Sequence, residues 1–207
     1  MFERFPRPAE IGDLEILPDE ELMRRALASP ESTGVHGFEI DSPLGRFGLA
    51  ASAFGVAMVF LPGFDDDTIH DRFARFGRLA WASWGRQRAI QGGIELMGYL
   101  VGEVRRFETP VDVSYATPFQ QSIFRTLQDV PFGETITYGE LAREAGQKGK
   151  ARAVGTVMRH NPCPIFVPCH RVLPASGALG GWSGPAGMKR ALLEHEGVLP
   201  ADDAVAN

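Results

Sequence analysis

The hydrophobic pattern changes its period along the chain. Residues 35–61, VHGFEIDSPLGRFGLAASAFGVAMVFL, hold short apolar runs separated by SPLG and FG, a pattern that predicts a small antiparallel sheet. In residues 86–107 apolar positions recur every three to four residues, which predicts an amphipathic helix with one stripe facing the core; the stripe comprises Ile90, Ile94, Met97, Val101 and Val104. Residues 17–29, LPDEELMRRALAS, predict a further short helix in an acidic N-terminal segment.

The second half of the chain predicts a mostly helical domain. Residues 108–116 have little periodicity, and the stretch 108–118 holds two prolines, which favours a linker between two domains. Thr117 can cap a helix that begins at Pro118, with four apolar residues inward, namely Phe119, Ile123, Phe124 and Leu127. Helices over residues 138–145 and 151–159 follow, separated by the turn GQKGK, and this arrangement is typical of a helix-turn-helix. The predicted fold class is α+β, with a small antiparallel sheet and helices first and the helix-turn-helix second.

Charge changes the interpretation of the two helices. The whole chain has a net charge of −5, yet residues 115–199 hold nine basic and six acidic side chains. Lys148, Lys150, Arg152 and Arg159 lie on the turn and the second helix, and Arg152 is near that helix's N-terminus, where the backbone dipole favours phosphate. A solvated basic face is the alternative, but local charge matters more than total charge for contact with nucleic acid.

The chain has only two cysteines. The run Ile165–Val167 predicts a buried strand that ends at Pro168, which would place Cys169 at its mouth, directly before His170. A thiolate nucleophile needs a nearby base. Two glutamates near the C-terminus, Glu194 and Glu196, could orient that base, and the spacing does not choose between them; Cys-His-Glu also fits a thiol hydrolase.

Other features restrict the class of protein. Cys163 and Cys169 are six positions apart, which is not a zinc-finger spacing, so we expect no metal and no cofactor. No apolar run reaches the roughly 20 residues of a membrane helix, and the N-terminus has no secretory pattern. We therefore expect a cytoplasmic protein with free thiols and no membrane partner.

Residues 117–197 resemble the C-terminal domain of the O6-alkylguanine-DNA alkyltransferases, also called methylated-DNA–protein-cysteine methyltransferases. The resemblance is carried by TPFQQ, PFGETITYGELA, ARAVG, RHNPCPIFVPCHRV and SGPAGMKRALLEHEG. Residues 35–107 match the family's N-terminal domain only in layout, and the first 34 and last eight residues do not match it. We therefore expect five parts: an N-terminal extension (1–34), a ribonuclease H-like α/β domain (35–107), a linker (108–116), the alkyltransferase DNA-binding domain (117–199) and a tail (200–207). The implied activity is direct-reversal DNA repair, in which a flipped base loses its O6-alkyl group irreversibly to a cysteine; O4-alkylthymine is a further possible substrate.

The resemblance also implies roles for individual residues. Cys169 would accept the alkyl group, His170 would take its proton through a water, and Glu196 would orient His170, because the register selects it over Glu194. Asn161 would brace the cysteine turn, and Tyr138 would donate a proton toward guanine N3. The implied base- and DNA-binding set includes Arg152 as the finger that fills the stack, the Ser183 backbone N–H toward O6, and the carbonyls of Cys169 and Val172 toward the exocyclic amine, with Trp182, Gly155 and Arg159 completing it.

Two positions depart from the family pattern. Trp182 stands where a tyrosine is usual, so it can pack on the base but lacks the hydroxyl contact. Pro185 stiffens a loop that is commonly Gly-Gly, and we therefore expect lower tolerance of bulky alkyl groups. The expected partner is double-stranded DNA containing O6-alkylguanine, bound by a monomer or by cooperative assembly along the duplex. Two other functions fit parts of the sequence. One is an alkyltransferase-like protein that binds damaged DNA without transfer, although such proteins replace the reactive cysteine. The other is a Cys-His thiol hydrolase.

Overall fold

The computed structural model describes residues 3–4, 36–42, 44–63 and 83–200. The chain divides into two compact units between Tyr115 and Ala116. The helix predicted over residues 17–29 lies outside the described residues.

The first unit contains the predicted antiparallel meander. Strands β2 (His36–Ser42), β3 (Gly45–Ser52) and β4 (Gly55–Phe60) pair in sequence order, and the two-residue β1 (Glu3–Arg4) adds in parallel beside β2. Ser42 pairs with Gly45 and Ser52 with Gly55 across the hairpins, so both predicted turns are confirmed. Residues 110–112 then join the edge of β4, where Val56 exchanges two backbone hydrogen bonds of 2.8 Å with Pro110 and Asp112.

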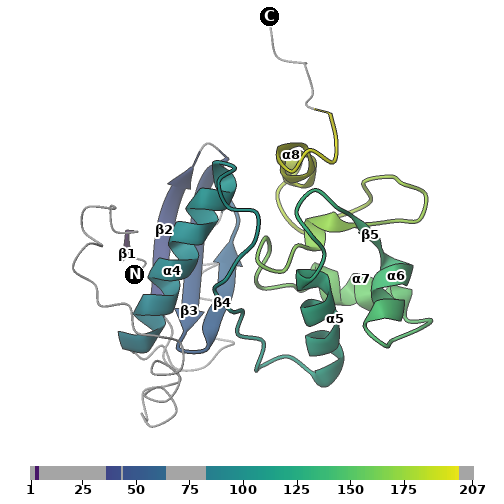
Figure 1. Cartoon of the computed structure of the whole chain (residues 1–207), viewed down its shortest axis with the longest axis horizontal. Helices are drawn as coiled ribbons and strands as arrows, with labels where there is room; N and C mark the ends of the chain where they lie inside the picture. The colour runs from purple at the N-terminus through teal and green to yellow at the C-terminus, as the bar shows by residue number, and fades with distance from the viewer. Residues whose placement is uncertain (1–2, 5–35, 43, 64–82, 201–207) are drawn as a thin grey trace, which may run out of the picture. The chain divides into compact units, whose positions relative to one another are not determined.

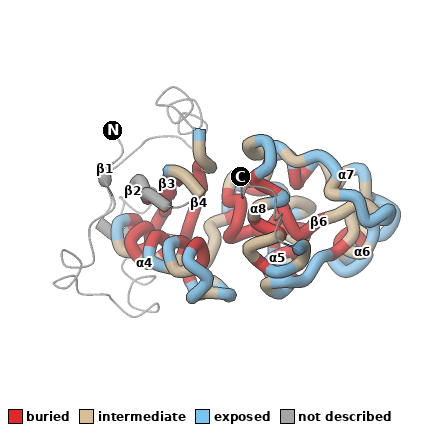
Figure 2. Tube along the Cα trace, turned by 90° about the horizontal axis from the view of Figure 1, so that it is seen from above, coloured by how far each residue is buried: buried red, intermediate tan, exposed pale blue. Residues whose placement is uncertain are grey.

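One helix, α4 (Ser83–Leu100), packs on the sheet formed by β2, β3 and β4 (Figure 1). The stripe predicted to face the core is wrong for three of its members, because Ile94, Met97 and Val101 are exposed. The buried face combines small and large residues, and the tube in Figure 2 alternates accordingly between buried and exposed along α4. This face comprises Gly85, Arg88, Ala89, Ile90, Gly92, Gly93, Leu96, Tyr99 and Leu100. Small side chains let the helix backbone approach the sheet closely, and periodicity of the large apolar residues misses such a face.

The helix is also shorter at its C-terminal end than predicted. It ends at Leu100, and Gly102 follows with a left-handed φ of 83°. The backbone N–H groups of Glu103 and Val104 both donate to the Gly98 carbonyl, at 2.8 and 3.0 Å. A glycine just past the last turn is the usual end of a helix, so Val104 folds back onto Gly98 and does not extend the stripe.

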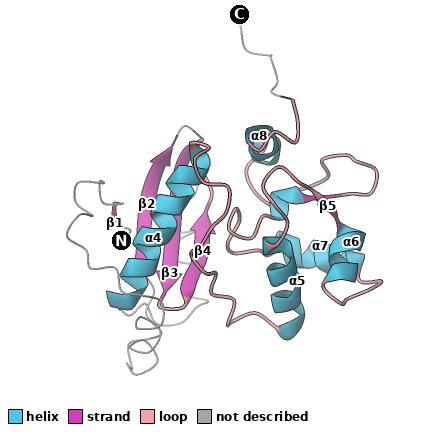
Figure 3. Cartoon of the chain, viewed as in Figure 1, coloured by secondary structure: helices cyan, strands magenta, loops and turns pink. Residues whose placement is uncertain are grey.

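The second unit contains the predicted helices (Figure 3). α5 (Pro118–Gln128), α6 (Tyr138–Glu144) and α7 (Ala151–Arg159) are followed by α8 (Met188–His195). Thr117 and Thr137 cap α5 and α6, each in a reciprocal capping box with the residue three positions on. The turn between α6 and α7 contains Gly146 and Gly149, both at positive φ, so the helix-turn-helix prediction is confirmed in type and position.

The segment before the cysteine is buried as predicted, but it is not a strand. Pro164 bridges to Val167, and the Val167 N–H donates to the Cys163 carbonyl at 2.8 Å. Ile165 adopts φ 77°, a left-handed conformation that is strained for a β-branched residue. The run therefore closes a tight turn inside the core, and a 3-10 turn over Cys169–Arg171 comes next.

Candidate active site

A short parallel sheet brings the two halves of the site together. β5 (Ile136–Thr137) pairs with β6 (Val172–Leu173), with Ile136 opposite Val172. β5 leads directly into Tyr138 at the first turn of α6, and β6 directly follows the Cys169 turn. Residues more than thirty positions apart in the sequence are thereby held on neighbouring backbones.

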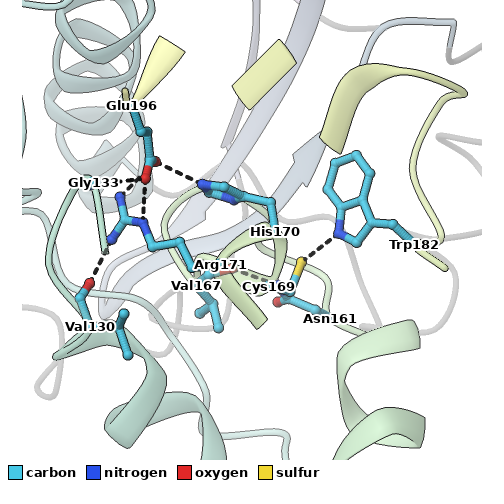
Figure 4. A network of polar contacts seen from close by, with 9 residues as sticks. All are labelled: Val130, Gly133, Asn161, Val167, Cys169, His170, Arg171, Trp182 and Glu196. Carbon is cyan, nitrogen blue, oxygen red and sulfur yellow. Dashed lines mark hydrogen bonds and ion pairs between the residues drawn. The ribbon is translucent and has the colours of Figure 1, made fainter. Parts of the chain in front are cut away.

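The sulfur of Cys169 is almost enclosed. The residue is 3% exposed, and the Trp182 indole N–H donates to its Sγ at 3.1 Å (Figure 4). Burial raises the pKa of the Cys169 thiol, while hydrogen bonds from Trp182 and Asn161 and the positive charge of Lys189 act to lower it. The group is therefore held as a thiol at neutral pH, and it needs a base when it reacts.

The imidazole of His170, next to Cys169, is held in a defined tautomer. Its Nε2 lies 2.8 Å from Glu196 Oε1, and both side chains are buried. Because a carboxylate only accepts hydrogen bonds, Nε2 carries the proton and Nδ1 carries the lone pair. Burial outweighs the neighbouring carboxylate and lowers the pKa of His170, so the imidazole is neutral at pH 7. Nδ1 is buried and has no protein partner among the described residues, which leaves it able to receive a proton.

Glu196 is fixed by more than the histidine. Arg171 Nε donates to Oε2 and Nη2 to Oε1, both at 2.9 Å, and the Gly133 N–H donates to Oε2 at 3.3 Å. Arg171 Nη1 also donates to the Val130 carbonyl at 2.6 Å. Hydrogen bonds and charges from His170 and Arg171 outweigh burial and hold the pKa of Glu196 far below its usual range. The carboxylate therefore orients the imidazole and stabilises its protonated form, and it does not take the proton itself.

The cysteine turn is braced by Asn161. Its Nδ2 donates to the Val167 carbonyl at 2.8 Å, and its Oδ1 accepts from the Cys163 N–H at 3.0 Å. These two bonds span the strained turn at Ile165. Cys163 itself is fully buried, as expected for a thiol without a chemical role.

Tyr138 faces the cysteine from α6. Partial burial, and secondarily the negative charge of the Cys169 thiolate, raise the pKa of Tyr138, so its hydroxyl keeps its proton and can donate it. Gly155 of α7 lies beside the ring, since a Cβ atom there would be 3.9 Å from Tyr138 Cε1. On α7 the side chains of Arg152 and Arg159 are exposed, and Ser183 is exposed in the loop before α8.

Comparisons with known proteins agree with this geometry. Residues 118–198 match the family described as 6-O-methylguanine DNA methyltransferase, DNA binding domain. A methylated-DNA–protein-cysteine methyltransferase of Mycolicibacterium paratuberculosis is 38% identical over 158 residues, which cover 76% of this chain and 89% of the relative. The corresponding protein of Methanosarcina acetivorans is 34% identical and covered over 95% of its length. This chain belongs to the methylated-DNA–protein-cysteine methyltransferase family.

Solved structures support the family fold over most of the chain. Mycobacterium tuberculosis OGT in complex with DNA superimposes with a TM-score of 0.64 at 36% identity, covering 81% of this chain and 96% of the other. The enzyme from the archaeon Pyrococcus kodakaraensis gives a TM-score of 0.57 at 25% identity. The predicted α+β fold is confirmed. Within the described residues, no helix is long and apolar enough to cross a membrane.

Two buried charged residues near the cysteine of this methyltransferase are not among those that the sequence singles out. Arg171 pairs with Glu196 in the core, and Lys189 Nζ donates to the Val172 carbonyl at 2.8 Å while nearly fully buried. Arg171 follows His170 directly, and Lys189 lies between Met188 and Arg190, so neither charge stands out in an apolar run. The structure brings Glu196, and not Glu194, to His170; Glu194 instead lies 3.4 Å from Arg190.

Proposed function

We propose that the protein repairs DNA by moving an alkyl group from O6 of guanine to Cys169, once per molecule. The observation that carries the proposal is a buried Cys169 thiol directly before the buried His170–Glu196–Arg171 network, in the same compact unit as a basic helix-turn-helix. A thiol hydrolase has no use for that helix pair, and a binding protein without transfer has no use for the network.

The reaction balances with the residues present. The thiol proton passes through a water to His170 Nδ1, and the sulfur attacks the alkyl carbon. The S–C bond forms as the C–O6 bond breaks, and the electron pair of that bond stays on guanine. Tyr138 donates a proton to guanine N3 and then recovers a proton from protonated His170. The net result is that the thiol proton ends on the base. The product is a thioether, which water does not reverse, and the stoichiometry is one alkyl group per protein.

The base must leave the duplex to reach a buried sulfur. Unstacking costs a few kcal/mol, and an inserted side chain offsets it. Arg152 is exposed at the start of α7 and fits that role, with Arg159 further along the same helix. Helix-turn-helix contact through the minor groove reads little sequence, which suits inspection of any site.

The guanine pocket uses backbone groups beside the cysteine. The Ser183 N–H would donate to O6, and the carbonyls of Cys169 and Val172 would accept from the exocyclic amine. Lys189 already donates to the Val172 carbonyl, but that oxygen has a second lone pair for the base. The partner is double-stranded DNA carrying O6-alkylguanine, bound by a monomer that can assemble along the duplex.

Intact-protein mass after mixing with a duplex carrying one O6-methylguanine tests the proposal. We expect a gain of one methyl group, stopping at one equivalent and mapping to the peptide that contains Cys169. Cys163→Ala is the matched control and should react normally, whereas Cys169→Ala should bind the duplex without gaining mass. A wild-type protein that binds the lesion and gains no methyl group would refute transfer, and turnover of an ester by Cys169 would indicate a hydrolase.

A further inference from the structure

The loop that precedes α8 places Trp182 against the reactive sulfur. The indole Nε1 lies 3.1 Å from Cys169 Sγ, and Figure 4 shows the N–H edge of the ring directed at the sulfur. Indole nitrogen can only donate. A hydrogen bond of this kind strengthens when its acceptor becomes negative, so the contact favours the thiolate over the thiol.

The position of the indole depends on Gly184. A Cβ atom at residue 184 would overlap the six-membered part of the ring, lying 2.6 Å from Cε3 and 2.7 Å from Cη2 of Trp182. Gly184 does not have a positive φ, so its backbone conformation is open to alanine. Gly181, on the other side of Trp182, also lacks a positive φ, and a Cβ atom there would meet no atom within 4 Å. Of these two loop glycines, one on either side of Trp182, only Gly184 leaves the space that the indole ring occupies.

Trp182 is also the neighbour that can uncover the sulfur. Cys169 is 3% exposed, and His170, Val172 and Lys189 around it belong to the core. Trp182 is only half-buried and lies in a loop. A reagent or a flipped base can reach Sγ most readily by displacing this side chain.

We propose that Trp182 is a positioning residue that holds the Cys169 thiolate through its indole N–H and covers the sulfur until a substrate displaces the ring. The inference deepens the proposed function, because it rests on Cys169 being the alkyl acceptor. One side chain would thereby set both the thiolate fraction of Cys169 in the resting protein and the access of reagents to its sulfur.

The test is the pH dependence of Cys169 alkylation by iodoacetamide in the full chain without DNA. In this reaction the thiolate displaces iodide and forms an S–C bond, and peptide mass mapping separates Cys169 from Cys163. Trp182→Phe keeps a ring and removes the donor. We expect the pH midpoint of the Cys169 alkylation rate to rise by about one unit in this variant. Below that midpoint, Cys169 should then react about tenfold more slowly than in the wild type. Its limiting rate at high pH should rise by no more than about threefold, because a thiolate of higher pKa is only modestly more nucleophilic.

Gly184→Ala moves the ring and tests the cover. We expect the same rise in midpoint together with a limiting rate about tenfold or more above wild type, whereas Gly181→Ala should match wild type in both. If Trp182→Phe has the same pH midpoint as wild type, the indole N–H does not stabilise the thiolate. If Gly184→Ala has the same limiting rate as wild type, the ring does not restrict access to the sulfur. Thermal unfolding of each variant verifies folding. Since no DNA is present, these results are independent of whether methyl transfer from a duplex succeeds.

Discussion

Glu196→Gln removes one charge from the most highly connected carboxylate of the site. Glu196 Oε1 accepts from Arg171 Nη2 and His170 Nε2, and Oε2 accepts from Arg171 Nε and the Gly133 N–H. A glutamine has one oxygen, so its NH2 group must face one of these donor pairs. If the NH2 group replaces Oε2, it faces the Arg171 Nε–H and the Gly133 N–H, which are also donors. The buried charge of Arg171 is then no longer balanced by a carboxylate.

The expected cost follows from that geometry. Leaving one member of a buried ion pair uncompensated destabilises by about 3–5 kcal/mol, a large part of the ~5–15 kcal/mol that stabilises a domain. Glu194→Gln is the matched control, two residues away. Its pair with Arg190 spans 3.4 Å at a partly exposed site, and such i,i+4 pairs contribute about 0.3–0.5 kcal/mol.

The assay is urea unfolding followed by pulsed hydrogen exchange and peptide mass analysis, which reports the C-terminal unit separately. We expect Glu196→Gln to lose several kcal/mol and Glu194→Gln less than about 1 kcal/mol. The double variant Arg171→Met with Glu196→Gln should recover much of the loss, because removing both charges removes the uncompensated one. Equal stability of the two glutamine variants, or no recovery in the double variant, would refute the reasoning.

The remaining predictions concern transfer and pH. Tyr138→Phe should slow single-turnover methyl transfer by about a hundredfold while lesion binding is kept, because only the proton donor is lost; an unchanged rate would exclude that role. Arg152→Ala should slow transfer from a duplex by about a hundredfold but leave transfer from free O6-methylguanine unchanged, since only the stacked base must be flipped; equal losses on both substrates would contradict a finger role. Acidification should destabilise the C-terminal unit. The pKa values of His170 and Glu196 are both lowered in the folded state, so the unfolded chain binds protons first, and stability should fall below about pH 6.5 and more steeply below about pH 4.5. Urea midpoints between pH 7 and pH 3 check this, and a flat profile would refute it.

The sequence by itself determined the features that depend on near neighbours in the chain. Thr117 before Pro118, and Thr137 three residues before Glu140, fix the starts of α5 and α6 through capping bonds within one helical turn. Gly146 and Gly149 fix the turn of the helix-turn-helix in the same local way. These signals act over four residues or fewer, so they are legible in a single sequence.

Only the tertiary structure decided which distant groups meet. Packing against the sheet decided which face of α4 is buried, because Arg88 and Tyr99 lie in the core while Met97 of the predicted stripe is exposed. The buried run Ile165–Val167 became a turn because Asn161 bonds both sides of it. Glu196 meets Arg171 and His170 across 25 and 26 residues, and Trp182 meets Cys169 across 13. Such contacts depend on the path of the whole chain between them, and no local pattern encodes that path.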